Sequence, residues 1–174
     1  MEFDKDLRSV QEVRDLLAQA KKAQKALAVM TQQQLDAITA AISRAGAQHA
    51  RRLADMAVEE TGFGRKEDKE IKNRFAAVTL YEAIKDQKTH GILAEDKEHR
   101  TVDIGVPVGV VAGLVPSTNP TSTVIYKAMI CMLACKALLS GLLDDFLRRH
   151  IARTATALRL YRLIEILHVD RRRV

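Results

Sequence analysis

The stretch from Thr101 to Val115, TVDIGVPVGVVAGLV, restricts the fold more than any other part of the chain. It is rich in β-branched residues, is interrupted by glycine and carries no charge after Asp103. Apolar runs of this kind are typical of strands that a parallel sheet buries on both faces. We interpret the stretch as two strands that meet at Pro107, the second spanning 108–115. A helix is predicted next, over 120–136, with a proline near its first position, where proline is favoured.

Helices are expected before these strands. Apolar residues at spacings of three and four predict the first helix over 9–28. Thr31 and Gln34 form a capping box, which predicts the start of a second helix. This second helix should run toward Glu59, with Gly46 as the point where it is interrupted.

A third helix is expected from about Lys66, after Gly62, which is well placed to close the preceding helix in a left-handed conformation. It should end before Gly91, and the charged segment 86–100 is interpreted as a loop or an edge segment. Helices, then strands, then a helix predict the opening of an α/β domain. The apolar residues expected at helical spacing in the third helix are Ile71, Phe75, Val78, Tyr81 or Glu82, and Ile84.

Composition narrows the classes of function. Aromatic residues make up 4% of the chain and tryptophan is absent, which argues against stacking platforms for single-stranded nucleic acid. Cys131 and Cys135 lie four apart in an apolar stretch with no nearby histidine, so we expect small buried side chains and no metal site. The sequence shows neither a leader of the secretory type nor an apolar run of 18 residues. These features predict a cytoplasmic protein with no membrane partner.

The segment from Pro116 to Thr123, PSTNPTST, leaves two interpretations of Asn119 open. An asparagine before a helix can simply cap the first free N–H groups of that helix. However, the carboxyl end of a strand is also where open α/β sheets bind ligands, and an asparagine held there can donate a hydrogen bond to a developing oxyanion. Spacing alone does not choose between the cap and the ligand site.

Three stretches together resemble the aldehyde dehydrogenase superfamily, and in particular its CoA-acylating, acetaldehyde dehydrogenase-like branch. The resemblance covers most of 1–137, and the PSTNPTS segment is its most specific part. It implies the N-terminal part of an aldehyde dehydrogenase-type fold, with an incomplete Rossmann-like cofactor domain. The stretches that carry it are ETGFGR, KEDKEIKNR and GVPVGVVAGLVPSTNPTSTVIYK.

The resemblance also implies a reaction. An aldehyde forms a thiohemiacetal on a cysteine, hydride passes to NAD, and CoA takes the acyl group from the resulting thioester. Asn119 matches the asparagine that steadies the oxyanion, and Lys127 matches a lysine of the following helix. The residues that match the stretch along the nicotinamide are Val115, Pro116, Ser117 and Thr118.

The sequence departs from the family pattern after Ala137. Segment 138–174 holds eight arginines, nine leucines and no lysine. We therefore divide the chain into 1–137, a truncated cofactor-binding region, and 138–174, an atypical tail in which 146–167 can form an amphipathic helix. A frameshift near codon 138 in a GC-rich gene would explain this composition, and a shortened relative with a new tail is the alternative.

The departure bears on activity. The nucleophilic cysteine of the family is not found, and neither Cys131 nor Cys135 is assigned to that role. We therefore expect the chain alone to be inactive and to associate through exposed strand edges, as a homo-oligomer or otherwise. An alternative function is a non-catalytic helical protein that pairs with a full-length dehydrogenase. Nucleic-acid binding is disfavoured, because a terminal arginine run is more often a solvated charge run.

Overall fold

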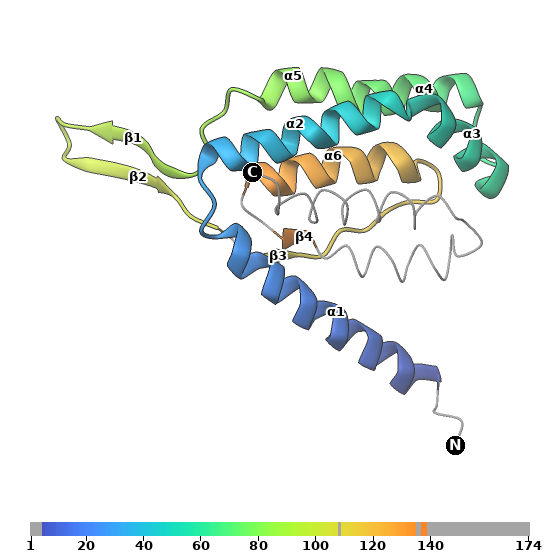
Figure 1. Ribbon diagram of the computed structural model, residues 1–174, viewed down its shortest axis with the longest axis horizontal. Coiled ribbons are helices and arrows are strands. Elements are labelled where there is room, and N and C mark those ends of the chain that lie inside the picture. Colours follow the sequence, from blue (N-terminus) through green and yellow to red (C-terminus); the bar gives the residue numbers. More distant parts are fainter. Residues whose placement is uncertain (1–4, 108, 135–136, 139–174) are drawn as a thin grey trace, which may run out of the picture.

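The computed structural model describes residues 5–107, 109–134 and 137–138. In these ranges two small sheets accompany a set of packed helices (Figure 1). The helical elements are α1 (Lys5–Leu27), α2 (Gln32–Gln48), α3 (Ala50–Thr61), α4 (Lys66–Arg74), the π-helical turn η1 (Phe75–Thr79), α5 (Leu80–Ile84) and α6 (Pro120–Leu133). The strands are β1 (Gly91–Asp96), β2 (Thr101–Gly105), β3 (Val110–Val111) and β4 (Ala137–Leu138).

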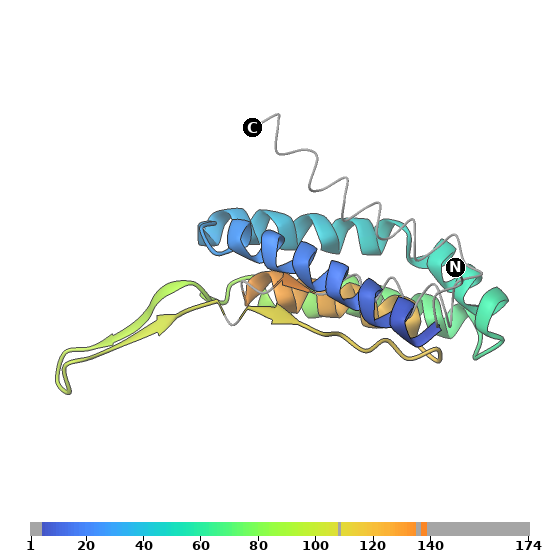
Figure 2. The ribbon, with the colours of Figure 1, turned by 90° about the horizontal axis from the view of Figure 1, so that it is seen from below.

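Helix α6 is the central element of the packed body. It contacts α2, α3, α4 and η1, and most of its residues are apolar and buried. Helix α1 extends away from this body in Figure 1 and contacts β3 and β4; in the view of Figure 2, from below, it passes in front of the other helices. The core between α2, α3, η1 and α6 is formed by the buried side chains Leu53, Ala76, Ala77, Ile125 and Met129.

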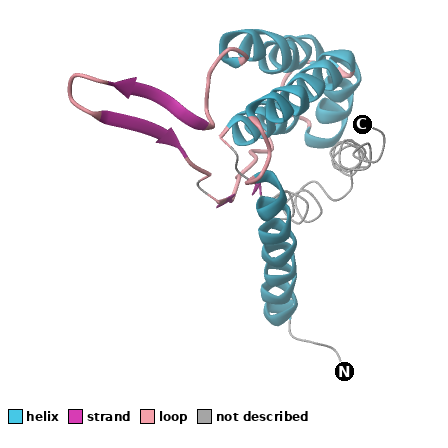
Figure 3. Cartoon of the chain, turned by 60° about the vertical axis from the view of Figure 1, so that its left-hand side comes forward, coloured by secondary structure: helices cyan, strands magenta, loops and turns pink. Residues whose placement is uncertain are grey.

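The two sheets differ in kind. Strands β1 and β2 form an antiparallel hairpin, which projects from the helices as a separate arm (Figure 3). Strands β3 and β4 pair in parallel, Val110 opposite Ala137, with α6 between them in the chain. The unit β3–α6–β4 is thus a βαβ crossover, the building block of parallel α/β sheets. The predicted order of helices, strands and helix is confirmed.

Local sequence signals predicted several helix ends correctly. Thr31 and Gln34 form the capping box of α2, and Gly62 closes α3 with a φ of 68°. The expected interruption at Gly46 is wrong, because α2 continues to Gln48 and the break falls at His49. Gly46 lies buried inside α2, where its missing side chain lets α2 approach Ala77 and Ile125.

The predicted third helix is present, but part of its expected apolar face points to solvent. Ile71 is 66% exposed and Phe75 is 62% exposed. The face that packs on the other helices instead carries Lys69, Asn73 and small alanines. Two causes act together: the π turn η1 shifts the helical register by inserting an extra residue, and small side chains let α4 and η1 lie close to α6.

The strand predictions were partly correct. Segment 86–100 contains both a strand and loops: β1 occupies Gly91–Asp96, whereas 86–90 and 97–100 are loop or turn, so each interpretation is correct for part of the segment. The buried strand expected over 108–115 is wrong in extent, since only Val110 and Val111 are in strand conformation among its described residues. Leu114 is 80% exposed, whereas Val115 is 1% exposed. In the described part of the chain β3 pairs with β4 alone, so no further strand extends the pairing.

The predictions for the second segment, 138–174, lie outside the described residues beyond Leu138. Those for Cys135 and Lys136 also lie outside them. Among the residues that the structure does describe, no helix is both long enough and apolar enough to cross a membrane.

Candidate functional site

The segment from Ala112 to Asn119 joins the carboxyl end of β3 to the first turn of α6. In a parallel α/β unit this is the edge where ligands bind, and a helix N-terminus adds free N–H groups and partial positive charge. The last four residues form a turn in which the N–H of Asn119 donates to the carbonyl of Pro116 at 3.3 Å. We call Ala112–Asn119 the β3–α6 connection.

Asn119 occupies the N-cap position of α6 but its side chain makes no capping hydrogen bond. Its backbone has φ of −142° and ψ of 60°. Instead, its Oδ1 accepts a hydrogen bond from Nζ of Lys72 at 3.0 Å. The simple cap interpretation therefore does not describe what the Asn119 side chain does, although its backbone does begin the helix.

Lys69 reaches the same turn from α4. Its Nζ donates to the carbonyl of Thr118 at 2.7 Å, and the residue is buried. Burial lowers the pKa of the Lys69 ammonium below its usual value, and the nearby charge of Lys72 lowers it further. A buried ammonium persists in such a place because the carbonyl oxygen partly replaces the water it has lost.

Asn73 completes the set on α4 and is fully buried. Its Nδ2 donates to the carbonyl of Ala50 at 3.0 Å, and its Oδ1 accepts from the hydroxyl of Thr121 at 2.7 Å. One carboxamide therefore joins the start of α3, the last turn of α4 and the first turn of α6. Buried amides that are satisfied on both ends fix the relative position of the elements they join.

A lysine of α6 binds the part of the β3–α6 connection that lies before Val115. Nζ of Lys127 donates to the carbonyl of Leu114 at 2.5 Å. The next residue, Val115, is buried, whereas Pro116 and Thr118 are exposed and Ser117 is half-buried. Lys69, Lys72 and Lys127 thus hold the β3–α6 connection from the two helices that flank it.

The structure brings together every site residue predicted from the sequence. Val115 is followed by the turn that Pro116, Ser117, Thr118 and Asn119 form, and Lys127 lies about two helical turns beyond it in α6. The sequence reasoning missed Lys69, Lys72 and Asn73 as partners of this turn. Their spacing of three and four residues places them on one face of α4. The local sequence does not indicate which part of the chain packs against that face.

The described residues also allow the environment of Cys131 and the presence of a metal-binding cluster to be examined. Cys131 is buried in α6, which matches the expectation of a small core side chain. In the same ranges, no group of three or more histidine, cysteine or acidic side chains is arranged to hold a metal ion.

Comparisons with known proteins show the family. The sequence model of the aldehyde dehydrogenase family matches residues 6–139. The bifunctional aldehyde-alcohol dehydrogenase AdhE of Escherichia coli K12 is 47% identical over 124 residues, which are 71% of this chain and 14% of that enzyme. The acetylating acetaldehyde dehydrogenase EutE of the same strain is 42% identical over 121 residues, or 66% of this chain and 24% of that enzyme.

A comparison with a solved structure points to the same family. The crystal structure of an acetylating aldehyde dehydrogenase from Geobacillus thermoglucosidasius superposes with a TM-score of 0.76 at 55% identity, covering 79% of this chain and 30% of that one. The chain therefore spans less than a third of the length of each of these three proteins. It belongs to the aldehyde dehydrogenase family, in the part of the family that includes the acetylating enzymes.

Proposed function

We propose that residues 1–137 are the N-terminal segment of an NAD-dependent, CoA-acylating aldehyde dehydrogenase. The reaction would convert a small aldehyde, CoA and NAD into an acyl-CoA and NADH. The observation that carries this proposal is the position of Asn119, at the end of the connection that leads from a parallel strand to the N-terminus of α6, with its side chain not used as a helix cap. The similarity to acetylating enzymes agrees with it.

Asn119 would act when negative charge develops on the aldehyde oxygen. An amide N–H fixed at that point stabilises the oxyanion, and one such donor is worth roughly 2.7–4 kcal/mol in acyl-transfer sites. The free N–H groups of the first turn of α6 lie beside it and favour the same charge. Lys127 would contribute by holding the carbonyl of Leu114, which fixes the strand end from which the connection starts.

NAD would lie along Val115, Pro116, Ser117 and Thr118 and would supply the hydride acceptor. The exposed positions of Pro116 and Thr118 fit this role, because they leave one side of the turn open while Val115 anchors it in the core. Backbone held by Lys69 and Lys127 would present a defined surface to the nicotinamide. This chain's residues would therefore position the cofactor and provide the oxyanion donor.

We also propose that the 174-residue chain alone does not catalyse this reaction. Cys131 is buried in α6, which does not suit a reactive thiolate nucleophile. The assay is NADH formation from acetaldehyde, CoA and NAD by the purified chain. A clear rate would refute the proposed inactivity.

The catalytic proposal is tested by reading the gene in all frames after codon 138. We expect another frame to restore family sequence with a cysteine motif, and the restored enzyme to oxidise acetaldehyde. In that enzyme Asn119→Ala should lower kcat on the order of 10²–10³-fold, with Ile71→Ala on the exposed face of α4 as the matched control. If no frame restores the motif, or if Asn119→Ala is as active as the parent, the proposal fails.

A second candidate function rests on a different observation. The β1–β2 hairpin exposes apolar side chains, including Ile92, Val102 and Ile104. This surface supports a non-catalytic protein that associates through its strand edges with further copies or with a full-length dehydrogenase. Co-purification of a tagged chain with the acetylating dehydrogenase of its own cell would support it, and a hairpin variant that retains the same co-purification would count against it. For either function we propose a cytoplasmic location.

A further inference from the structure

We propose that Lys72 is a positioning residue for Asn119: it fixes the orientation of the carboxamide and polarises it, so that Nδ2 is the group presented to the reaction. The inference rests on the proposed function and goes beyond it by assigning a role to a residue of α4. The juxtaposition that carries it is the 3.0 Å contact between Nζ of Lys72 and Oδ1 of Asn119.

The chemistry of the two partners determines the orientation of the amide. A lysine ammonium has three donors and no acceptor, whereas an asparagine side chain has one oxygen and one NH₂ group. The end of Asn119 that faces Lys72 must therefore be the oxygen. The NH₂ group then points away from Lys72, and within the described part of the chain it has no hydrogen-bond partner.

The backbone on both sides of Asn119 is fixed by the same face of α4. Lys69 holds the carbonyl of Thr118 at 2.7 Å, and Asn73 holds the hydroxyl of Thr121 at 2.7 Å. Both α4 residues are buried; the Asn73–Thr121 contact is buried and the Lys69–Thr118 contact is partly buried. The remaining freedom of Asn119 is rotation of its own side chain, and the contact with Lys72 restricts that rotation.

The charge on Lys72 has a further effect. Hydrogen bonds in a chain polarise one another, and a bond to an ionised donor is about twice as strong as a neutral one. An ammonium on Oδ1 draws electron density from Nδ2, which makes its N–H groups better donors. The contact would therefore both orient Asn119 and strengthen it as an oxyanion donor.

Lys72 is exposed, and its contact with Asn119 joins a charged donor to a neutral amide oxygen. Lys72 lies close enough to Lys69 for its charge to lower the pKa of the Lys69 ammonium. Two like charges on adjacent turns of one helix repel each other. In this structure both ammonium groups point at oxygen atoms of the same turn, Thr118 O and Asn119 Oδ1, which offsets the repulsion.

The first experiment measures the coupling in the full chain by NMR, without aldehyde, CoA or NAD. The side-chain NH₂ pair of Asn119 is identified in a ¹⁵N-labelled sample by its disappearance in Asn119→Ala. We expect Lys72→Met to shift the Nδ2 resonance and to speed rotation about the amide C–N bond severalfold, because the charge on Oδ1 is lost. Lys72→Arg should restore both signals, and Lys66→Met on the same helix is the matched control.

Two outcomes would overturn the inference: Asn119 signals in Lys72→Met that equal those of the parent chain, or a Lys72→Arg spectrum that equals that of Lys72→Met. The contact is also measured from the other partner, which guards against misfolding of one variant. The ammonium ¹H–¹⁵N signal of Lys72 should be visible at low temperature in the parent chain and lost in Asn119→Ala. A signal unchanged by Asn119→Ala would likewise contradict the contact.

The second experiment uses the enzyme with the restored frame and separates the inference from the proposed function. Lys72→Met should lower kcat with little change in KM, by less than removal of Asn119 itself, and Lys72→Arg should recover the rate. If Asn119→Ala is fully active, the proposed function fails while the NMR result is unaffected. If Asn119→Ala is inactive but Lys72→Met is as active as the parent, only the positioning role fails.

Discussion

At the residue scale, the buried polar side chains of Lys69, Asn73 and Thr121 lie around the β3–α6 connection. Asn73 has both ends of its carboxamide bonded, to Ala50 and to Thr121. Glu60 is the contrasting case, since its Oε1 is buried without a hydrogen-bond partner among the described residues. The bonded carboxamide of Asn73 fixes the relative position of the elements that it joins. The buried carboxyl of Glu60 makes the free energy of unfolding depend on whether Glu60 is protonated.

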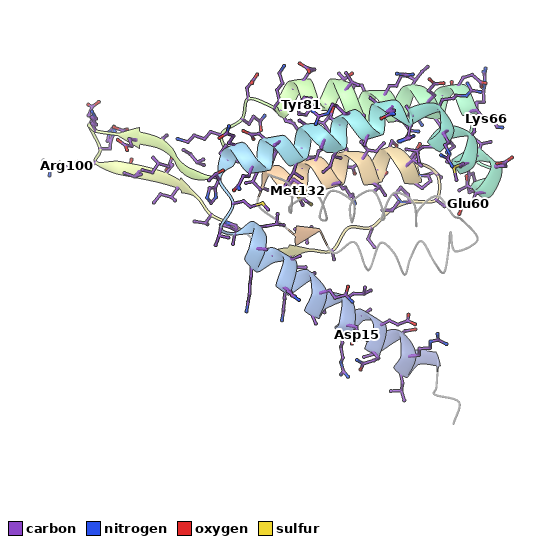
Figure 4. The ribbon with its side chains drawn as sticks, viewed as in Figure 1. Asp15, Glu60, Lys66, Tyr81, Arg100 and Met132 are labelled. Atoms are coloured by element: carbon purple, nitrogen blue, oxygen red, sulfur yellow. The ribbon has the colours of Figure 1, made fainter. Side chains whose placement is uncertain are left out.

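Burial raises the pKa of the Glu60 carboxyl from its ordinary value to about 7. Figure 4 shows Glu60 near the end of α3, close to the turn that leads to Lys66. Because the folded state holds the proton more tightly than the unfolded chain does, Glu60 favours folding at low pH. That contribution is lost as pH rises from about 4.5 to about 7.

We therefore expect Glu60→Gln to be more stable than the parent chain at pH 8 and nearly equal to it at pH 4.5. Glutamine stays neutral and so mimics the protonated acid. Urea unfolding of both proteins at the two pH values measures the difference, with the exposed Glu67→Gln as control. An advantage of Glu60→Gln that is the same at both pH values would show that burial does not shift this pKa.

At the element scale, the close packing of α2 against η1 and α6 depends on Gly46. A Cβ at this position would lie 3.0 Å from Cβ of Ala77 and 3.2 Å from Cγ2 of Ile125. Replacing glycine by alanine inside a helix gains about 1 kcal/mol of propensity. Crowding a packed interface costs about 1–3 kcal/mol. The cost of crowding should therefore exceed the gain in helix propensity.

We predict that Gly46→Ala lowers the free energy of unfolding by up to about 2 kcal/mol net of propensity, and that Gly46→Val lowers it more. Chemical denaturation monitored by circular dichroism measures both. Ala37→Gly, at an exposed position of the same helix, calibrates the propensity term and should cost about 1 kcal/mol. A Gly46→Ala variant that is more stable than the parent chain would contradict the close contact.

The same elements show what the sequence could and could not predict. The capping box at Thr31, the left-handed Gly62 and the proline that opens α6 are local signals, and each was placed correctly. The exposed face of α4 was placed wrongly, because the π turn and the neighbouring helices decide which side is buried. The partners of Lys69 and Lys72 could not be predicted from the local sequence. Both partners lie more than forty positions away, and the sequence pattern of α4 does not depend on them.

At the scale of the whole molecule, the β1–β2 hairpin extends away from the helical body, with Arg100 at its tip (Figure 4). Its exposed apolar residues include Ile104, which is 60% exposed. An apolar edge strand of this kind is a template for pairing with another chain. The hairpin is therefore the part of the described structure best suited to association.

We expect the chain to associate in a concentration-dependent way and the double variant Val102→Lys/Ile104→Lys to shift it toward monomer. Charge on an edge strand opposes pairing. Sedimentation velocity over a range of micromolar concentrations measures the effect, with Ile71→Lys on the exposed face of α4 as control. A parent chain that stays monomeric throughout, or a control that dissociates as the hairpin variant does, would contradict the assignment.

The contact between Lys72 and Asn119 also has a consequence for synthesis on the ribosome. The two residues are 47 positions apart, so at about 5–20 residues per second Asn119 is made roughly 2–10 s after Lys72. During that interval the ammonium groups of Lys69 and Lys72 must remain solvated, because Thr118 and Asn119 do not yet exist. Helices α2–α4 can pair early, but the turn at Asn119 takes its final form only after most of α6 has been translated.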